Sequence, residues 1–224
     1  MILFTITFLF SSILPYIYAK QCIHVVALHK SGSTALNYNV MKNLFPECVN
    51  EDKKSIALSN NNKYSKCNTI INFFRDGKND HDDIMNQIQS TECTSCKYYL
   101  QIRHPLDVMV SMYNSYTTAN HMYPKRITQE QIDKENAYRA KEHALGIDGY
   151  AIEYFRKRAV AAIERHIEFM HEARDTYKCD VYMGHYEAFV SSPREWATIF
   201  KYFAQLDAKQ VTLLNTWAES QANI

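Results

Sequence analysis

The chain has 224 residues, enough for one domain with a full hydrophobic core and too few for two domains of ordinary size. Its 46% hydrophobic and 22% charged residues exclude an intrinsically disordered chain. The formal net charge is only +1, so the chain is not a general binder of nucleic acids, and any anion site must be local.

The first segment, Met1 to Ala19, is uncharged and mostly apolar, which is typical of a secretory signal peptide or a membrane anchor. Pro15 and Ala19 suit a cleavage region, although no positive charge precedes the apolar run. A strand is expected from about Cys22, which leaves almost no stem for an anchor. We therefore expect a leader over 1–19, favour its cleavage, and expect one domain over 20–224. The membrane is a partner only if the leader remains uncleaved.

The next stretch, His24 to Leu36, reads HVVALHKSGSTAL. Four apolar residues predict a buried parallel strand, and the apolar periodicity through Leu44 predicts a helix that ends at Pro46. A hydroxyl-rich turn with one glycine between a strand and a helix is the layout that binds phosphate or sulfate. Lys30 precedes the glycine, so the nucleoside-triphosphate loop motif is absent. The alternative is an ordinary turn capped by Ser33 or Thr34.

Further along, residues 47–67 are polar and predict a surface loop, and residues 69–74 predict a second strand. A solvated run over 78–83 precedes a short helix expected over 84–88. Residues 98–102 predict a third strand and 106–116 its helix. Residues 117–150, with a helical patch over 128–144, suggest an insertion over the edge of the sheet.

The clearest helix is expected over 154–177, where apolar residues recur on one face. Its charged and histidine residues include one Glu-x-x-His, but a di-iron bundle needs two, so a solvent face is favoured; these residues are Glu164, His166, Glu168, His171 and Glu172. A fourth strand over 181–183 precedes a helix that starts at Pro193, with Trp196, Ile199, Phe200 and Phe203 expected to face inward. The alternation predicts an α/β three-layer sandwich with a central parallel sheet.

The stretch Tyr98 to Tyr113, YYLQIRHPLDVMVSMY, places Arg103 just after the third strand and Ser111 two helical turns further on. Tyr182 to Pro193, YMGHYEAFVSSP, places Tyr186 and Glu187 after the fourth. Ligands of parallel sheets bind outside the carboxyl ends of the strands, which is where these residues are expected to lie.

These stretches resemble the sulfotransferase family, which uses 3′-phosphoadenosine 5′-phosphosulfate as donor. HKSGST matches that family's P-K-S-G-T-T loop, RHPLDVMVS matches R-x-P-x-D-x-x-x-S, and YEAF is similar to Y-E-D-L. The resemblance covers roughly residues 22–206. It implies a P-loop nucleotide-binding α/β domain that needs no metal.

The resemblance also implies roles for single residues. Lys30 would stabilise charge on the bridging oxygen, and the cradle would hold the 5′-phosphate through Ser31, Gly32, Ser33 and Thr34. Arg103 and Ser111 would grip the 3′-phosphate, and Tyr186 would approach the adenine. Without the family pattern, Arg103 would be taken for a surface residue paired with Asp107.

The general base that an acceptor hydroxyl needs has no clean match. In many family members it is a His or Glu at the end of the second strand. The candidates here are Asp76 and then His81, the alternative being that DGKNDHDD is a solvated loop.

The chain has six cysteines, all after the leader, which suggests one to three disulfides with fifteen possible pairings. Cys48 and Cys67 are placed to tie down the polar loop between them. Cys93 and Cys96 precede a strand, whereas a redox pair should follow one, and no second pair supports a zinc site.

These features predict a sulfotransferase of the secretory pathway, in the Golgi lumen or secreted, that acts on a hydroxyl acceptor. The acceptor class, a glycan, rests on compartment and family analogy. Many family members carry a basic, glycine-containing loop near the C-terminus that completes the 3′-phosphate site, whereas Leu213 to Ile224 contain no Arg, Lys or Gly. Either this site is completed differently, the sequence is truncated, or donor binding is weakened. The alternatives are a secreted, non-catalytic anion- or nucleotide-binding protein on the same fold and a P-loop kinase-like enzyme.

Overall fold

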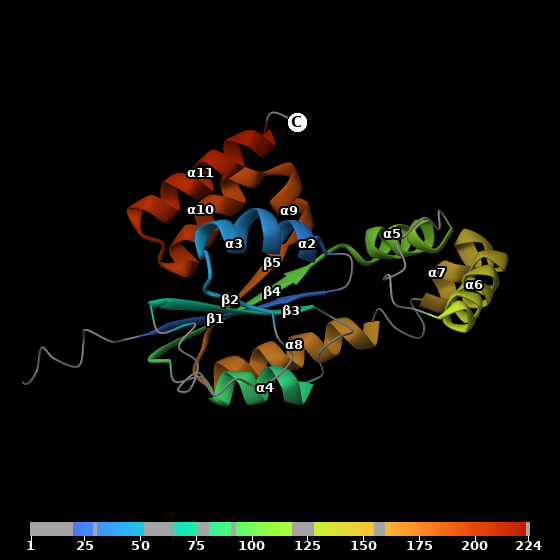
Figure 1. The fold of residues 1–224 in the computed structure, drawn as a ribbon, viewed down its shortest axis with the longest axis horizontal. Helices are drawn as coiled ribbons and strands as arrows, with labels where there is room; N and C mark the ends of the chain where they lie inside the picture. The colour runs from blue at the N-terminus through green and yellow to red at the C-terminus, as the bar shows by residue number, and fades with distance from the viewer. Residues whose placement is uncertain are drawn as a thin grey trace, which may run out of the picture.

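The computed structural model describes residues 20–28, 31–51, 64, 66–75, 81–90, 93–117, 128–154 and 160–222. Its described strands form one five-stranded parallel sheet in the order β2-β3-β1-β4-β5 (Figure 1). The strands are β1 Gln21–Ala27, β2 Val49–Asn50, β3 Thr69–Arg75, β4 Ser95–Ile102 and β5 Asp180–His185. Helices cover both faces, so the predicted three-layer α/β sandwich with a central parallel sheet is confirmed.

One face of the sheet is covered by the helix that follows β1 and by the C-terminal helices. Alternate β1 residues Ile23, Val25 and Ala27 point to this face, as the two-residue period of a strand requires. The covering helices are α2 Ser33–Ala35, η2 Leu36–Met41, α3 Lys42–Leu44, α9 Tyr186–Ser191, α10 Pro193–Ala204 and α11 Ala208–Ala222. Aromatic rings fill this layer, and Trp196 and Phe200 stack with their centroids 4.9 Å apart.

The opposite face is covered by α4 His81–Ser90 and α8 Val160–Asp175 (Figure 1). Val26 of β1 and Leu28 just after it lie on this side, where Ile84, Met85 and Phe169 pack in the same cluster. The remaining helices, α5 Pro105–Thr117, α6 Gln129–Ala144 and α7 Gly146–Tyr154, form a separate group with its own small core around Met109 and Tyr150. Figure 1 shows this group beyond the end of the sheet.

Several local predictions were wrong. The predicted loop over 47–67 contains the short strand β2, α4 begins three residues earlier than expected, and α7 and α11 were not predicted. The middle of the first helix is a π-helix. Ile199 was expected to face inward, but 41% of its surface is exposed. His166 was expected on a solvent face, yet it is 2% exposed. It lies three residues before Phe169 and seven before Ala173, which places it on the buried face of α8.

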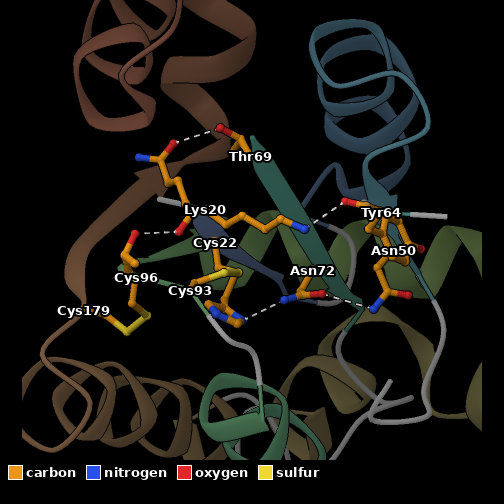
Figure 2. Close-up of a disulfide and its surroundings, with 12 residues drawn as sticks. Lys20, Cys22, Asn50, Tyr64, Thr69, Asn72, Cys93, Cys96 and Cys179 are labelled. Carbon is orange, nitrogen blue, oxygen red and sulfur yellow. Dashed lines mark hydrogen bonds between the residues drawn. A yellow bond between two sulfur atoms is a disulfide. The ribbon is translucent and has the colours of Figure 1, made fainter. Parts of the chain in front are cut away.

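All six cysteines lie at the amino ends of the strands, which we call the amino edge of the sheet. Each is either one of a strand's first two residues or lies no more than two residues before the strand begins. The three disulfides, two of them drawn in Figure 2, are Cys22–Cys93, Cys48–Cys67 and Cys96–Cys179. They join β1 to β4, β2 to β3, and β4 to β5. The pairing of Cys48 with Cys67 agrees with the prediction, and Cys93 and Cys96 bond to different partners. Disulfides in this number are typical of extracellular or secretory-pathway proteins.

The remaining neighbours, β1 and β3, are joined at this edge by hydrogen bonds. The Gln21 N–H donates to Asn68 O at 2.9 Å, and Thr69 Oγ1 donates to Gln21 Oε1 at 3.3 Å. The Lys20 ammonium donates to Tyr64 O at 3.3 Å (Figure 2). The described part of the chain contains no helix long and apolar enough to cross a membrane.

A row of buried polar side chains crosses the middle of the sheet from β2 to β1. Asn50 Nδ2 donates to Asn72 Oδ1 at 3.1 Å, and Asn72 Nδ2 lies 3.4 Å from His24 Nδ1 (Figure 2). The register places these three residues side by side. Burial lowers the pKa of His24 to about 3, so its imidazole is neutral at physiological pH.

Candidate functional site

The three sequence motifs come together at the carboxyl edge of the sheet. They follow β1, β4 and β5, which are neighbours in the strand order. Parallel strands end at the same edge, so turns separated by about 70 and 80 residues in the chain become adjacent. The sheet, not the local sequence, assembles this site.

After β1 the described chain resumes at Ser31, just before α2. The Ser31 N–H and the Ser31 hydroxyl both donate to Leu28 O, at 3.0 and 2.6 Å. Gly32 has φ +79°, a conformation that a side chain would strain, and Ser33 begins the helix. In the described residues no side-chain hydrogen bond caps this helix start. Its first N–H groups therefore suit an external anion.

Tyr186 links this cradle to the second motif. A Cβ atom at Gly32 would lie 2.6 Å from Tyr186 Cδ2, so only glycine fits beneath the ring. The Arg103 guanidinium carbon lies 4.5 Å from the centroid of the same ring, in cation–π geometry. One aromatic side chain thus contacts both predicted anion-binding turns.

The second motif is also held by Glu187. The N–H of His104, next to Arg103, donates to Glu187 Oε1 at 2.7 Å. The Glu187 carboxylate therefore binds a backbone donor outside its own helix. Ser111 lies on α5, two turns beyond Arg103, and is partly buried.

Three buried side chains form a series of hydrogen bonds that the sequence did not predict. Trp196 Nε1 donates to Tyr99 Oη at 3.0 Å, and the Tyr99 hydroxyl in turn donates to Gln101 Oε1. Burial raises the pKa of Tyr99, so its hydroxyl keeps its proton and remains a donor. The local signal was Gln101 itself, a polar residue in the otherwise apolar run expected over 98–102.

The Tyr99 and Gln101 side chains leave no room for a side chain at position 184 of β5. A Cβ atom at Gly184 would lie 2.6 Å from Tyr99 Cζ and 3.0 Å from Gln101 Oε1. The glycine therefore allows β5 to approach β4 closely just before α9 begins.

The residues expected to act on the transferred group are only partly described. Lys30 and Asp76 lie outside the described residues. His81 was expected in the run before a helix, but it is the first residue of α4; its side chain is outside the description. The roles of these three residues therefore remain predictions. Within the described residues, no group of three His, Cys, Asp or Glu side chains could hold a metal ion.

Comparison with known proteins gives one likeness. No protein-family model matches the sequence, and no curated protein matches it. Among solved structures, the chain is similar to the crystal structure of mouse sulfotransferase SULT7A1 complexed with PAP. The TM-score is 0.43 and the sequence identity 15%, over 90% of this chain and 63% of that chain. The chain thus spans less than two thirds of the length of that sulfotransferase.

Proposed function

We propose that this chain is a sulfotransferase that transfers the sulfuryl group of 3′-phosphoadenosine 5′-phosphosulfate to a hydroxyl acceptor. The observation that carries the proposal is the contact of Tyr186 with both Gly32 and Arg103. It supports a site in which the Gly32 turn and the Arg103 guanidinium both lie against one aromatic ring. A nucleotide with phosphates at its 5′ and 3′ positions has the matching chemistry.

The described residues fit this donor at both ends. The N–H groups at the start of α2, with the Ser33 and Thr34 hydroxyls, would hold the 5′-phosphosulfate. Ser31 shapes the cradle, because its own N–H and hydroxyl are bonded to Leu28 O. Arg103 and Ser111 would hold the 3′-phosphate.

In the proposed reaction the protein positions the reacting groups and stabilises negative charge. Lys30 would donate to the oxygen that bridges sulfur and the leaving phosphate as that sulfur–oxygen bond breaks. Asp76, or His81 in its place, would accept the proton of the acceptor hydroxyl as its oxygen bonds to sulfur. The sulfated acceptor and adenosine 3′,5′-bisphosphate are the products.

The disulfides support a site of action in an oxidising compartment. We extend this to the Golgi lumen, with residues 1–19 as the leader and a glycan as the hydroxyl acceptor. Neither a nucleic acid nor a metal ion takes part in the proposed reaction.

A second candidate is a non-catalytic protein that binds the nucleotide on the same fold. One observation favours it: residues 208–222 form a helix whose Leu214 and Ala218 pack into the core. This stretch therefore does not supply the basic loop that many sulfotransferases use at the 3′-phosphate site.

The test is calorimetric titration of the folded protein with adenosine 3′,5′-bisphosphate and, separately, with ATP and Mg²⁺. We expect the bisphosphate to bind and ATP not to bind. Arg103→Ala should weaken bisphosphate binding by about 1.5–3 kcal/mol, the value of a charge-assisted hydrogen bond. Arg165→Ala, on the exposed surface of α8, is the matched control and should bind as the unmodified protein does.

A sulfate-transfer assay with hydroxyl acceptors separates the two candidates. Turnover that is lost in Lys30→Ala, with bisphosphate binding largely kept, supports the enzyme. Binding without turnover on any acceptor supports the non-catalytic protein. Absence of bisphosphate binding by the folded chain rejects both, and binding of ATP with Mg²⁺ would support a kinase-like enzyme.

A further inference from the structure

The first two residues of α9, Tyr186 and Glu187, contact the turns that follow β1 and β4, although neither residue belongs to those turns. The Tyr186 ring lies against Gly32 and against the Arg103 guanidinium. Glu187 accepts the His104 N–H at 2.7 Å. The start of α9 is therefore a bridge between the cradle and the Arg103 turn, and Glu187 holds the Arg103 end of that bridge through the His104 N–H.

The pairing of β5 with β4 in the sheet sets the position at which α9, and so this bridge, begins. In the β4–β5 register Gln101 lies opposite Gly184 and Ile102 lies opposite His185, so β5 ends level with β4. The buried Tyr99 and Gln101 side chains fill the space above Gly184. Trp196 holds the Tyr99 hydroxyl, and α9 begins at Tyr186 directly after β5.

We propose that Tyr186 and Glu187 are positioning residues that fix the separation between the cradle and Arg103, and thereby select ligands with two anionic groups. This inference rests on the proposed function, in which those two turns hold the 5′ and 3′ groups of one nucleotide. The class of ligand selected is a nucleoside bisphosphate, in preference to a nucleoside monophosphate.

The physical reason is that two rigidly spaced subsites bind a matching ligand as one unit. Once the first anionic group is bound, the second finds its partner already in place and pays little further ordering cost. If the Arg103 turn moves independently of the cradle, this advantage is lost. A monophosphate that occupies the cradle alone does not depend on the spacing.

Glu187 offers the sharpest test, because it acts through the His104 N–H rather than on the ligand. Glu187→Ala removes the acceptor, whereas Glu187→Gln keeps an oxygen acceptor of the same size. We would measure the dissociation constants of adenosine 3′,5′-bisphosphate and of adenosine 5′-monophosphate for the unmodified protein and both variants. We expect Glu187→Ala to weaken bisphosphate binding about tenfold. The monophosphate should change by less than about twofold, and Glu187→Gln should restore bisphosphate binding.

A second measurement reports the contact without any ligand. Amide hydrogen exchange at His104 should be faster in Glu187→Ala and close to the unmodified rate in Glu187→Gln, because exchange requires the hydrogen bond to open. For the ring, Tyr186→Phe should keep the preference for the bisphosphate, and Tyr186→Leu should lose it.

Equal weakening of both nucleotides in Glu187→Ala would overturn the inference, because Glu187 would then support the whole site rather than its spacing. Unchanged bisphosphate binding in Glu187→Ala, despite faster exchange at His104, would also overturn it while leaving the proposed function in place. If the unmodified protein shows protection at His104 but binds no bisphosphate, the proposed function fails and the inference fails with it.

Discussion

At the amino edge of the sheet neighbouring strands are joined covalently, whereas at the carboxyl edge they meet through polar turns. Three of the four neighbouring strand pairs carry a disulfide at the amino edge. At the other edge the contacts are the Tyr186 ring, the Glu187 carboxylate and a glycine with positive φ.

The difference shows how the fold separates stability from recognition. Disulfides limit the unfolded chain, so they stabilise the whole domain from one edge. The opposite edge is then able to expose N–H groups and keep a glycine at positive φ, a residue that loses more conformational entropy on folding than any other. The comparison predicts that changes at the two edges have different consequences.

The largest expected effect is on stability, at the amino edge. The double variant Cys96→Ala, Cys179→Ala should lower the free energy of unfolding by about 2–5 kcal/mol, because it releases a loop that the disulfide closes. Denaturant titration measures this loss. At temperatures where the variant remains folded, the affinity for adenosine 3′,5′-bisphosphate should be unchanged; a parallel loss of affinity would show that the two edges are not separate.

The next effect is on binding, at the carboxyl edge. Gly32→Ala combines a positive φ with a Cβ that the Tyr186 ring excludes, so it should displace Tyr186 and weaken bisphosphate binding at least about tenfold. Gly146→Ala is the matched control, since Gly146 has φ +66° and no atom within 4 Å of a Cβ.

Both glycine variants should lose about 1–2 kcal/mol of stability from the backbone conformation, because alanine disfavours positive φ. Only Gly32→Ala should also lose affinity. Equal affinities in the two variants would contradict the contact between Gly32 and Tyr186 as a feature of the binding site.

The third effect lies between the edges, at His24. Its folded pKa of about 3 is below the ordinary value of 6.5, so below pH 6.5 the unfolded chain takes up a proton that the folded chain does not. The stability that the neutral His24 contributes is fully present above pH 6.5 and is lost progressively as the pH is lowered toward 3. From pH 7 to pH 5 the loss from this group is about 2 kcal/mol.

Unfolding titrations at pH 7 and pH 5 measure this dependence, with His24→Gln as the variant and His143→Gln, on the exposed surface of α6, as the control. His24→Gln should flatten the pH dependence, and His143→Gln should leave it unchanged. The same slope in His24→Gln as in the unmodified protein would assign the dependence to another group.

The main strands were predictable because each is a short run of apolar residues. The strands expected over 25–28, 69–74, 98–102 and 181–183 are found, with shifted ends, as β1, β3, β4 and β5. Strand β2 was missed because it has two residues in a polar stretch and is ordered by its pairing with β3. Helix α7 was missed because Gly146 and Gly149 indicate a turn, yet Gly146 begins the helix and Gly149 lies inside it.

The candidate site was predictable only as separate pieces. The glycine turn, Arg103 and Tyr186 each follow a strand, and that position can be recognised from the local pattern. The contact of one ring with both Gly32 and Arg103 joins residues that are far apart in the chain, and no local pattern encodes it. Gln101 gave a weak signal as a polar residue in an apolar strand, and nothing indicated its partners Tyr99 and Trp196.

The sequence by itself determined the class of fold, because alternating strand and helix patterns with short connections form a parallel sheet covered on both faces. It also placed the polar turns after strands, and it supplied an even number of cysteines. The tertiary structure alone decided the order of the strands, and with it the disulfide pairing and the meeting of the three turns. The physical reason is that periodicity reports which face of an element is buried, whereas contacts between distant residues depend on which strands become neighbours.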